Sequence, residues 1–252
     1  DNMKRNYFDF LWAMTEKEIK ARYKRAVFGF LWVILNPVLQ MLIIGAIFSF
    51  FIKIPDYFLF LFTGLLAWNF FSLSVSKTTS SIVNERALLQ KAKFPTEAIP
   101  ISIILSNFFH MLVSFILLFM ILVPLGKIAF PQVLLLIPAL LWILVFTVGI
   151  SLFFASLNVR FRDVNFFVQT LLILWFYATP VLYSLNLIPD KLYPLFSLNP
   201  LSSIFELFHF SLLGQGVVSQ EIMVSNLAIS LIIIFLGIAM FKKEQKYFVD
   251  WL

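Results

Sequence analysis

Long apolar stretches alternate with short polar connectors along this chain. Windows without Lys, Arg, Asp or Glu cover residues 26–52, 57–76, 98–126, 128–159, 164–189 and 222–241. An α-helix needs roughly 20 apolar residues to cross the hydrocarbon core of a membrane, and irregular backbone cannot face lipid. The pattern therefore predicts an all-α integral membrane protein, whose six transmembrane helices cover residues 28–51, 58–76, 99–123, 132–157, 165–183 and 222–241.

The positions of the basic residues give this arrangement an orientation. If the N-terminus is cytoplasmic, only Lys53, Lys127 and Lys191 of the 19 Lys and Arg residues fall on the outer side. Cytoplasmic connectors of membrane proteins carry the excess of Lys and Arg. We therefore expect both termini in the cytoplasm.

Two segments do not read as crossings. Residues 1–27 place apolar side chains at helical spacing with lysines off that stripe, which predicts an amphipathic helix in the cytoplasmic interface. Residues 184–221 are too interrupted for a crossing, but Asn199-Pro200 is a typical helix start and Gly214 a typical helix end. We expect this outer region to form a re-entrant helical hairpin that acts as a gate.

Prolines fall within two of the expected crossings. Asn36-Pro37 lies in the first crossing and Thr179-Pro180 in the fifth. Proline removes a backbone hydrogen bond and usually kinks a helix, so we expect bends at both places.

The composition excludes several functions. At 252 residues and 61% hydrophobic, the chain is a single membrane domain with no room for a soluble catalytic domain. It has two histidines, His110 and His209, and lacks metal-ligand spacings, a nucleophile elbow and a phosphate-binding loop. We expect no catalytic residue, metal or cofactor on this chain, and no nucleic-acid partner, because its net charge of +6 lies in the connectors. Uphill transport would need energy from another polypeptide.

Two cytoplasmic connectors carry distinctive charged groups. Residues 84–91 read as a short helix stopped by Phe94-Pro95, suited to a groove in a cytoplasmic protein, or else as a solvated turn. Arg160, Arg162 and Asp163 form a charged turn, which is either a second contact with such a partner or an intramolecular ion pair.

Several strings, in order and spacing, resemble one known family. They are Arg22 to Trp32 with Asn36-Pro37, Asn84 to Lys91 with Lys93-Phe94-Pro95, Asn158 to Val164, and Tyr177 to Tyr183 followed by Asn199-Pro200. Together they look like the ABC-2 family of polysaccharide export permeases, from about Tyr7 to the last crossing. Two departures are Phe28, where leucine is expected, and Ala178-Thr179, where serine often precedes the proline.

The resemblance implies a homodimer in the bacterial inner membrane, with two copies of a separate ATPase chain that carries ATP and Mg²⁺. Its substrate would be a lipid-linked polysaccharide, with O-antigen the leading interpretation and teichoic acid or capsule the alternatives. An ABC-2 exporter of drugs or small lipids is a different class, and a membrane enzyme acting on lipid-linked sugars is a third. A wide pore lined by aromatic residues would favour a polymer, and a closed pocket a small molecule.

The resemblance and the chemistry of such a substrate also imply site residues. The residues expected to couple to the ATPase are Asn84, Glu85, Arg86, Leu88, Lys91, Phe94, Pro95, Arg160, Arg162 and Asp163. Arg22, Lys24 and Arg25 are expected to bind a lipid pyrophosphate, with ordinary topological anchoring as the alternative. Aromatic faces contact the CH faces of sugars, so we predict a channel lined by Phe28, Trp32, Trp175, Tyr177 and Tyr183, for which lipid contact is the alternative.

Overall fold

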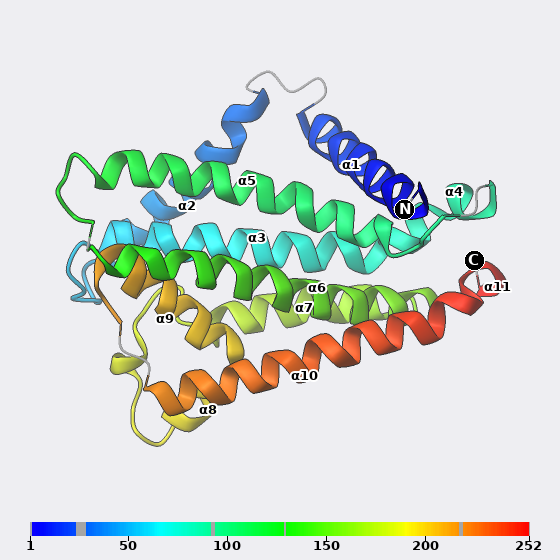
Figure 1. The fold of residues 1–252 in the computed structure, drawn as a ribbon. Helices are drawn as coiled ribbons and strands as arrows, with labels where there is room; N and C mark the ends of the chain where they lie inside the picture. Colours follow the sequence, from blue (N-terminus) through cyan, green and yellow to red (C-terminus); the bar gives the residue numbers. More distant parts are fainter. Residues whose placement is uncertain (1, 24–28, 92–93, 129, 217–218, 252) are drawn as a thin grey trace.

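The computed structural model describes residues 2–23, 29–91, 94–128, 130–216 and 219–251, with residues 2–6, 23, 30, 91 and 249 described by their backbone alone. Within these ranges every regular element is a helix (Figure 1), which confirms the expected all-helical class. The α-helices are α1 Asn2–Tyr23, α2 Trp32–Phe48, α3 Tyr57–Asn84, α4 Arg86–Lys91, α5 Ala98–Leu122, α6 Leu136–Arg160, α7 Val164–Tyr177, α8 Tyr193–Ser197, α9 Pro200–Leu213, α10 Gln220–Glu244 and α11 Phe248–Trp251. Short 3₁₀ turns occur at η1 Gly29–Leu31, η2 Gln132–Leu135, η3 Leu185–Leu187 and η4 Gln245–Tyr247.

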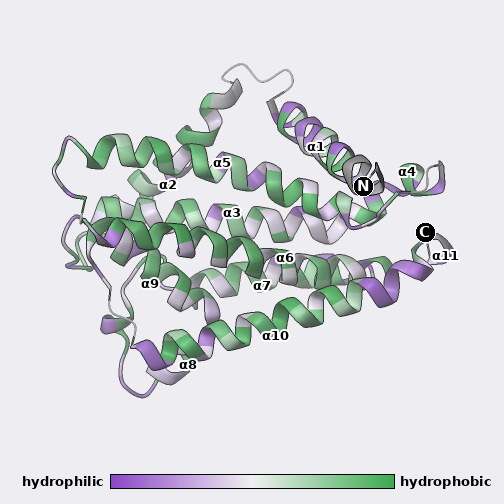
Figure 2. Ribbon diagram, viewed as in Figure 1, coloured by the Kyte–Doolittle hydropathy of each residue, from purple (hydrophilic) through white to green (hydrophobic). Residues whose placement is uncertain are grey.

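Several helices are apolar over most of their length. In the described part of the chain, 4 helical segments are long and apolar enough to cross a membrane: α3, α5, α6 with η2, and α10 with η4. The helices α2, α7 and α9 are apolar but shorter. Figure 2 shows hydrophobic residues along the middle of the long helices, and hydrophilic residues on α1 and toward the end of α10. The chain is therefore a multi-pass membrane protein.

Two expected crossings are shorter as helices than the sequence predicted. For residues 28–51, regular α-helix begins at Trp32 and ends at Phe48, and residue 28 lies outside the described ranges. For residues 165–183, α7 stops at Tyr177. Because the ring of Pro180 conflicts with the carbonyl four residues earlier, the helix ends before it. The predicted bend at Thr179-Pro180 is therefore wrong, whereas Pro37 does lie inside α2.

The helix α3 differs in the opposite direction. It was expected to end at residue 76, but it continues to Asn84 and makes the polar run before the connector helical. Thr78, Thr79 and Ser81 satisfy their hydroxyls by donating to backbone carbonyls within α3, at 2.7 Å in each case. These local hydrogen bonds let polar residues continue a buried helix.

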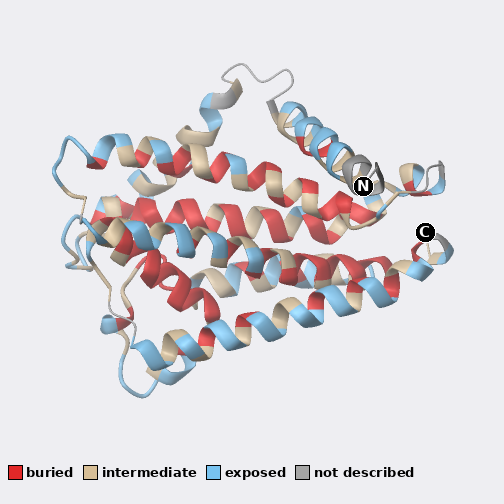
Figure 3. Cartoon of the chain, viewed as in Figure 1, coloured by how far each residue is buried: buried red, intermediate tan, exposed pale blue. Residues whose placement is uncertain are grey.

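Among the four described segments long enough to cross a membrane, α3 is the most buried and α10 the least (Figure 3). The most apolar window of α3 is 72% buried inside the protein, against 17% for α10. Packing of α10 against α6 depends on two glycines, since a Cβ on Gly237 would overlap the backbone of Gly149. Small residues at such a crossing let membrane helices approach closely. Thus α3 is the central helix, and α10 lies at the periphery against α6.

The helix α9 has the ends that the sequence predicted. The Asn199 side chain caps it by accepting a hydrogen bond from the Leu201 N–H at 3.2 Å, and Pro200 occupies the first turn. Gly214 ends it with a left-handed φ of 66°. All residues of α9 except Phe210 and Leu213 are buried, so this short helix is an interior element of the bundle.

A hydrophobic cluster joins the elements at one end of the bundle. It includes Met14 of α1, Leu89 of α4, Val159 of α6 and Phe248 of α11. The start of α1, α4 and α11 lie together at this end, and α8 and α9 lie toward the other (Figure 1). The N-terminal helix, the connector α4 and the C-terminal helix therefore form one packed unit.

Candidate functional site

A cavity of about 920 Å³ lies among α1, α2, α3, α5 and α7. Its aromatic wall residues are Trp32, Trp68, Phe70, Phe176 and Tyr177. Its polar wall residues are Arg22, Asn36, Gln40, Asn69, Ser72, Ser76, Asn107, His110, Ser114 and Gln169. Among the described residues of this wall there is no Asp or Glu. Such a wall offers neutral hydrogen-bonding groups and aromatic faces within largely apolar surroundings.

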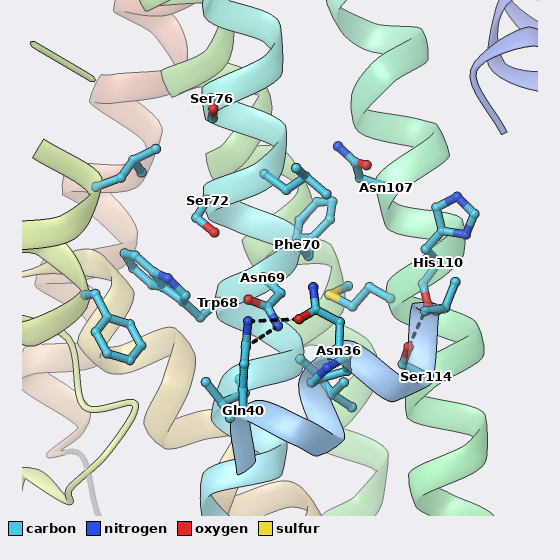
Figure 4. Close-up of a pocket in the computed structure, with 18 of the residues that line it drawn as sticks. Asn36, Gln40, Trp68, Asn69, Phe70, Ser72, Ser76, Asn107, His110 and Ser114 are labelled. Atoms are coloured by element: carbon cyan, nitrogen blue, oxygen red, sulfur yellow. Dashed lines mark hydrogen bonds between the residues drawn. The ribbon is translucent and has the colours of Figure 1, made fainter. Parts of the chain in front are cut away.

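Carboxamide side chains of α2 and α3 meet in this cavity (Figure 4). Asn69 Nδ2 donates to Gln40 Oε1 at 3.0 Å, and Gln40 Nε2 donates to Asn36 Oδ1 at 3.4 Å. Asn36 and Gln40 are four residues apart on α2 and so lie on one face of that helix. The two bonds therefore link α2 to α3 through side chains that also face open space.

The polar surface continues along α3 toward the connector α4. Ser72 and Ser76 follow Asn69 at helical spacing on the same wall, as Figure 4 shows. Ser76 Oγ accepts a hydrogen bond from Gln169 Nε2 of α7 at 2.7 Å. We call this set the polar track, and its members are Asn36, Gln40, Asn69, Ser72, Ser76 and Gln169.

Arg22 contributes the positive charge of this wall. Its Nη1 donates to Asn107 Oδ1 at 3.2 Å, and Asn107 Nδ2 donates to Ser74 Oγ at 3.1 Å. The end of α1 is thereby tied to α5 and α3. Of the three residues predicted to bind a pyrophosphate, Arg22 lies on the cavity wall, while Lys24 and Arg25 fall outside the described residues.

The predicted channel aromatics divide into two groups. Trp32 and Tyr177 line the cavity, and Phe28 lies outside the described residues. Trp175 instead packs edge-on against Phe71, with ring centroids 5.3 Å apart. Tyr183 does not line the cavity, and its hydroxyl donates to the Tyr177 carbonyl at 2.6 Å.

Trp175 belongs to a second set of polar contacts, which we call the outer polar network. Its Nε1 donates to Asn199 Oδ1 at 3.0 Å, and Asn199 Nδ2 donates to the Ala178 carbonyl and to Thr179 Oγ1, each at 3.1 Å. From α10, Asn226 Nδ2 donates to the Ser197 carbonyl at 2.7 Å and to Ser203 Oγ at 2.6 Å. The network joins α7, α8, α9 and α10. Its members are Trp175, Ala178, Thr179, Ser197, Asn199, Ser203 and Asn226.

The connector predicted to couple to a partner makes specific contacts with α1. Glu85 forms an ion pair of 2.8 Å with Lys17, and the ring of Phe94 lies 5.0 Å from that of Phe10. Burial, and then the negative charge of Glu97, raise the pKa of the Tyr7 hydroxyl above its ordinary value. The connector and α1 therefore meet through an ion pair and an aromatic contact.

The other predicted coupling residues of this connector vary in exposure. Arg86 and Pro95 are exposed, and Leu88 packs against the cluster at this end. Asn84 is exposed and donates to Ser80 Oγ at 3.3 Å. Lys91 ends α4, and its side chain is outside the description.

The charged turn after α6 is not held by an ion pair between its own residues. Within the described ranges, neither Arg160 nor Arg162 forms a salt bridge with Asp163, so that alternative is wrong. The Arg160 guanidinium instead lies 5.1 Å from the Phe161 ring centroid and 5.6 Å from that of Trp251. Aromatic faces attract the guanidinium in place of a carboxylate, and Arg162 and Asp163 stay exposed.

Sequence reasoning missed the polar track. The predicted site residues at the membrane level were charged or aromatic, and the polar track contains neither kind of residue. A usable signal was present, because Asn36 and Gln40, and then Asn69, Ser72 and Ser76, recur at helical spacing inside apolar windows. Polar residues aligned on one face of a membrane helix point to an interior surface.

The sequence was compared with known proteins. Residues 9–213 match the family described as ABC-2 type transporter. The chain is 32% identical over 248 residues to an O-antigen export system permease protein RfbA of Myxococcus xanthus, covering 97% of this chain and 95% of that protein. It is 34% identical over 255 residues to a protein of the same name from Klebsiella pneumoniae, covering 96% of this chain and 95% of that one.

Proposed function

Because this chain belongs to the ABC-2 type transporter family, we propose that it is the transmembrane subunit of an ATP-driven exporter of lipid-linked O-antigen in the bacterial inner membrane. The observation that carries the proposal is similarity over nearly the full length to two O-antigen export permeases. The cavity fits that assignment, because its wall combines aromatic faces with neutral hydrogen-bonding groups. Sugars need both kinds of contact.

We further propose six crossings, made by α2, α3, α5, α6, α7 and α10. In the short helices α2 and α7, the adjoining residues would complete the passage through the membrane. The helices α8 and α9 would form the outer re-entrant hairpin, and the position of α1, α4 and α11 at one end supports cytoplasmic termini. In this arrangement α1 lies at the cytoplasmic interface.

The proposed assembly is a homodimer with two ATPase chains. Large apolar side chains of α2 and α7 are exposed beside the cavity, among them Leu39, Ile43, Phe166, Ile173 and Leu174. A second copy covering this surface would close the cavity into a channel between the subunits. ATP and Mg²⁺ would be held by the ATPase chains, with no cofactor on this one.

Movement of the ATPases would reach the membrane through the connector. The ion pair between Glu85 and Lys17 and the contact of Phe94 with Phe10 link α4 and its flanking residues to α1. The end of α1 is tied to the cavity wall by Arg22, which we propose binds the pyrophosphate of the substrate lipid together with Lys24 and Arg25. A displacement of α4 would then shift the cation at the cavity wall.

The test is to deplete this chain in its own bacterium and identify what accumulates. We expect lipid-linked O-polysaccharide to collect on the inner leaflet while surface O-antigen falls, with both reversed by the wild-type gene. Undiminished surface O-antigen, or accumulation of a teichoic acid or capsule precursor instead, would refute the assignment to O-antigen.

A further inference from the structure

We propose that the polar track is a binding surface for the hydroxyl groups of sugar residues as a glycan passes through the cavity. This inference rests on the proposed function and adds to it a specific set of contacts. The track residues come from α2, α3 and α7, and all of them line the cavity. Figure 4 shows those of α2 and α3. They are neutral, and none is aromatic.

The geometry leaves hydrogen-bonding groups available to a ligand. A carboxamide has two N–H donors and an oxygen that accepts two bonds. In the described part of the chain, Asn69 uses one donor for Gln40, and Gln40 uses one donor for Asn36. Neither the Asn69 oxygen nor the Asn36 nitrogen has a hydrogen-bond partner among these residues. Because these groups face the cavity, a ligand can reach them.

The chemistry of the track fits sugar hydroxyls better than it fits a lipid or an ion. Each hydroxyl both donates and accepts, as carboxamides do collectively, and serine hydroxyls add the same capacity. A hydrocarbon tail would leave these polar groups without partners, at a cost in free energy. A phosphate would favour cations, but Arg22 is the sole Lys or Arg among the described wall residues.

The placement of the track also suits a ligand that moves. Asn69, Ser72 and Ser76 span about 10 Å along α3 at the rise of an α-helix, so they form a line and not a single pocket. The aromatic residues of the wall supply faces for the CH groups of the same rings. Neutral hydrogen bonds exchange more readily than charge-assisted ones, because each is weaker. A polymer can therefore slide from one group to the next.

A purely structural role is the competing explanation. The bond from Asn69 to Gln40 joins α3 to α2 and could serve only to hold these helices together. In that case, replacing either residue would lower thermal stability without altering ligand affinity. Binding and stability must therefore be measured on the same variants.

The experiment uses the complex of this chain with its ATPase in lipid nanodiscs. Tryptophan fluorescence, to which Trp32 and Trp68 of the wall contribute, is followed during titration with O-polysaccharide freed from its lipid. Undecaprenyl pyrophosphate, which carries no sugar, is the second probe. The variants are Asn69→Leu and Gln40→Leu, with Asn69→Ser as a polar replacement and Gln220→Leu, exposed and away from the cavity, as the control.

We expect Asn69→Leu and Gln40→Leu to bind the polysaccharide about fivefold more weakly, as loss of one net hydrogen bond predicts. Asn69→Ser should retain most of the affinity, Gln220→Leu all of it, and every variant should bind undecaprenyl pyrophosphate like the wild type. Equal polysaccharide affinity in the wild type and the Leu variants would overturn the proposal that the polar track binds sugars, whether or not the variants lose stability. That result would leave the proposed function intact. A wild-type complex that binds neither probe would count against the proposed function itself.

Discussion

The outer polar network and the polar track are both sets of polar side chains among apolar helices, but they differ in what surrounds them. Asn226 and Ser203 of the network are each 0% exposed, and their hydrogen bonds join helix to helix. Asn36 of the track is exposed, and it lies with Asn69 beside a cavity of about 920 Å³. A closed network fixes structure, whereas an open one is available to a ligand.

The network also supplies a hydrogen-bond donor to a backbone carbonyl just beyond the end of α7. The helix α7 ends at Tyr177, because Pro180 cannot continue it. Asn199 supplies a donor to the Ala178 carbonyl and at the same time caps α9. One side chain thus binds the residue that follows α7 and caps α9, which links these two helices.

The largest effect on stability is expected from Asn199→Leu, which tests the outer polar network. The change removes the cap of α9 and leaves Trp175 Nε1 and the Ala178 carbonyl without partners. A lost cap costs about 1 kcal/mol and each unsatisfied buried group about 1–3 kcal/mol. We expect the free energy of unfolding to fall by about 3 kcal/mol or more. Thermal unfolding in detergent, followed by size-exclusion chromatography, measures it.

Asn186→Leu is the matched control for that experiment, because Asn186 is exposed and its side chain forms no hydrogen bond or ion pair with the described residues. Its melting temperature should equal that of the wild type. If Asn199→Leu were as stable as Asn186→Leu, the network would not fix the outer helices.

A smaller loss is expected from Asn226→Ala, which separates α10 from the network. The Asn226 amide donates to the Ser197 carbonyl and to Ser203 Oγ, and both bonds disappear. Interhelical hydrogen bonds of membrane proteins contribute about 0.6 kcal/mol each on average. We expect a loss of about 1–2 kcal/mol, measured as above, with Gln220→Ala unchanged. A loss of stability as large as that of Asn199→Leu would show that Asn226 stabilises the protein by more than its hydrogen bonds account for.

Local sequence signals predicted the ends of α9 well. Asn199, Pro200 and Gly214 mark the ends of α9, because capping depends on the side chains and backbone angles at those positions. The apolar windows likewise predicted the long helices, since segments that cross a membrane are apolar over about 20 residues. The end of α7 was misjudged, because an apolar window continues through Pro180 although the helix does not.

The site was harder to predict than the fold. Trp32 and Trp175 lie on similar apolar stretches, yet Trp32 lines the cavity and Trp175 packs against Phe71. The direction of an aromatic side chain depends on how the neighbouring helices pack, and the local sequence around the residue does not specify that packing. Asn69 belongs to the polar track because the fold brings α3 beside α2, where Asn69 donates to Gln40.

Gln169→Leu tests the polar track. Gln169 is exposed and donates to Ser76 Oγ at 2.7 Å, so its removal should change stability by less than about 1 kcal/mol. Export should nevertheless fall several-fold, because the track loses its contribution from α7. The readout is the rate at which O-antigen reaches the cell surface in a strain that expresses only the variant.

Thr170→Val on the neighbouring position of α7 is the control for Gln169→Leu. Thr170 is exposed but does not line the cavity, so export should stay at the wild-type rate. Normal export in the Gln169→Leu strain would remove α7 from the track and confine sugar contacts to α2 and α3.

The smallest effect on stability is expected where a polar contact is neither buried nor beside the cavity. Lys17 and Glu85 are 51% and 30% exposed in their ion pair, and exposed pairs contribute about 0–1 kcal/mol. Glu85→Lys should therefore leave the melting temperature within a degree or two, but it should lower substrate-dependent ATP hydrolysis by the complex, because α4 is repelled from α1. Adding Lys17→Glu restores an opposite pair and should recover hydrolysis. If the double variant stayed as impaired as Glu85→Lys alone, Glu85 would act on the ATPase directly and not through α1.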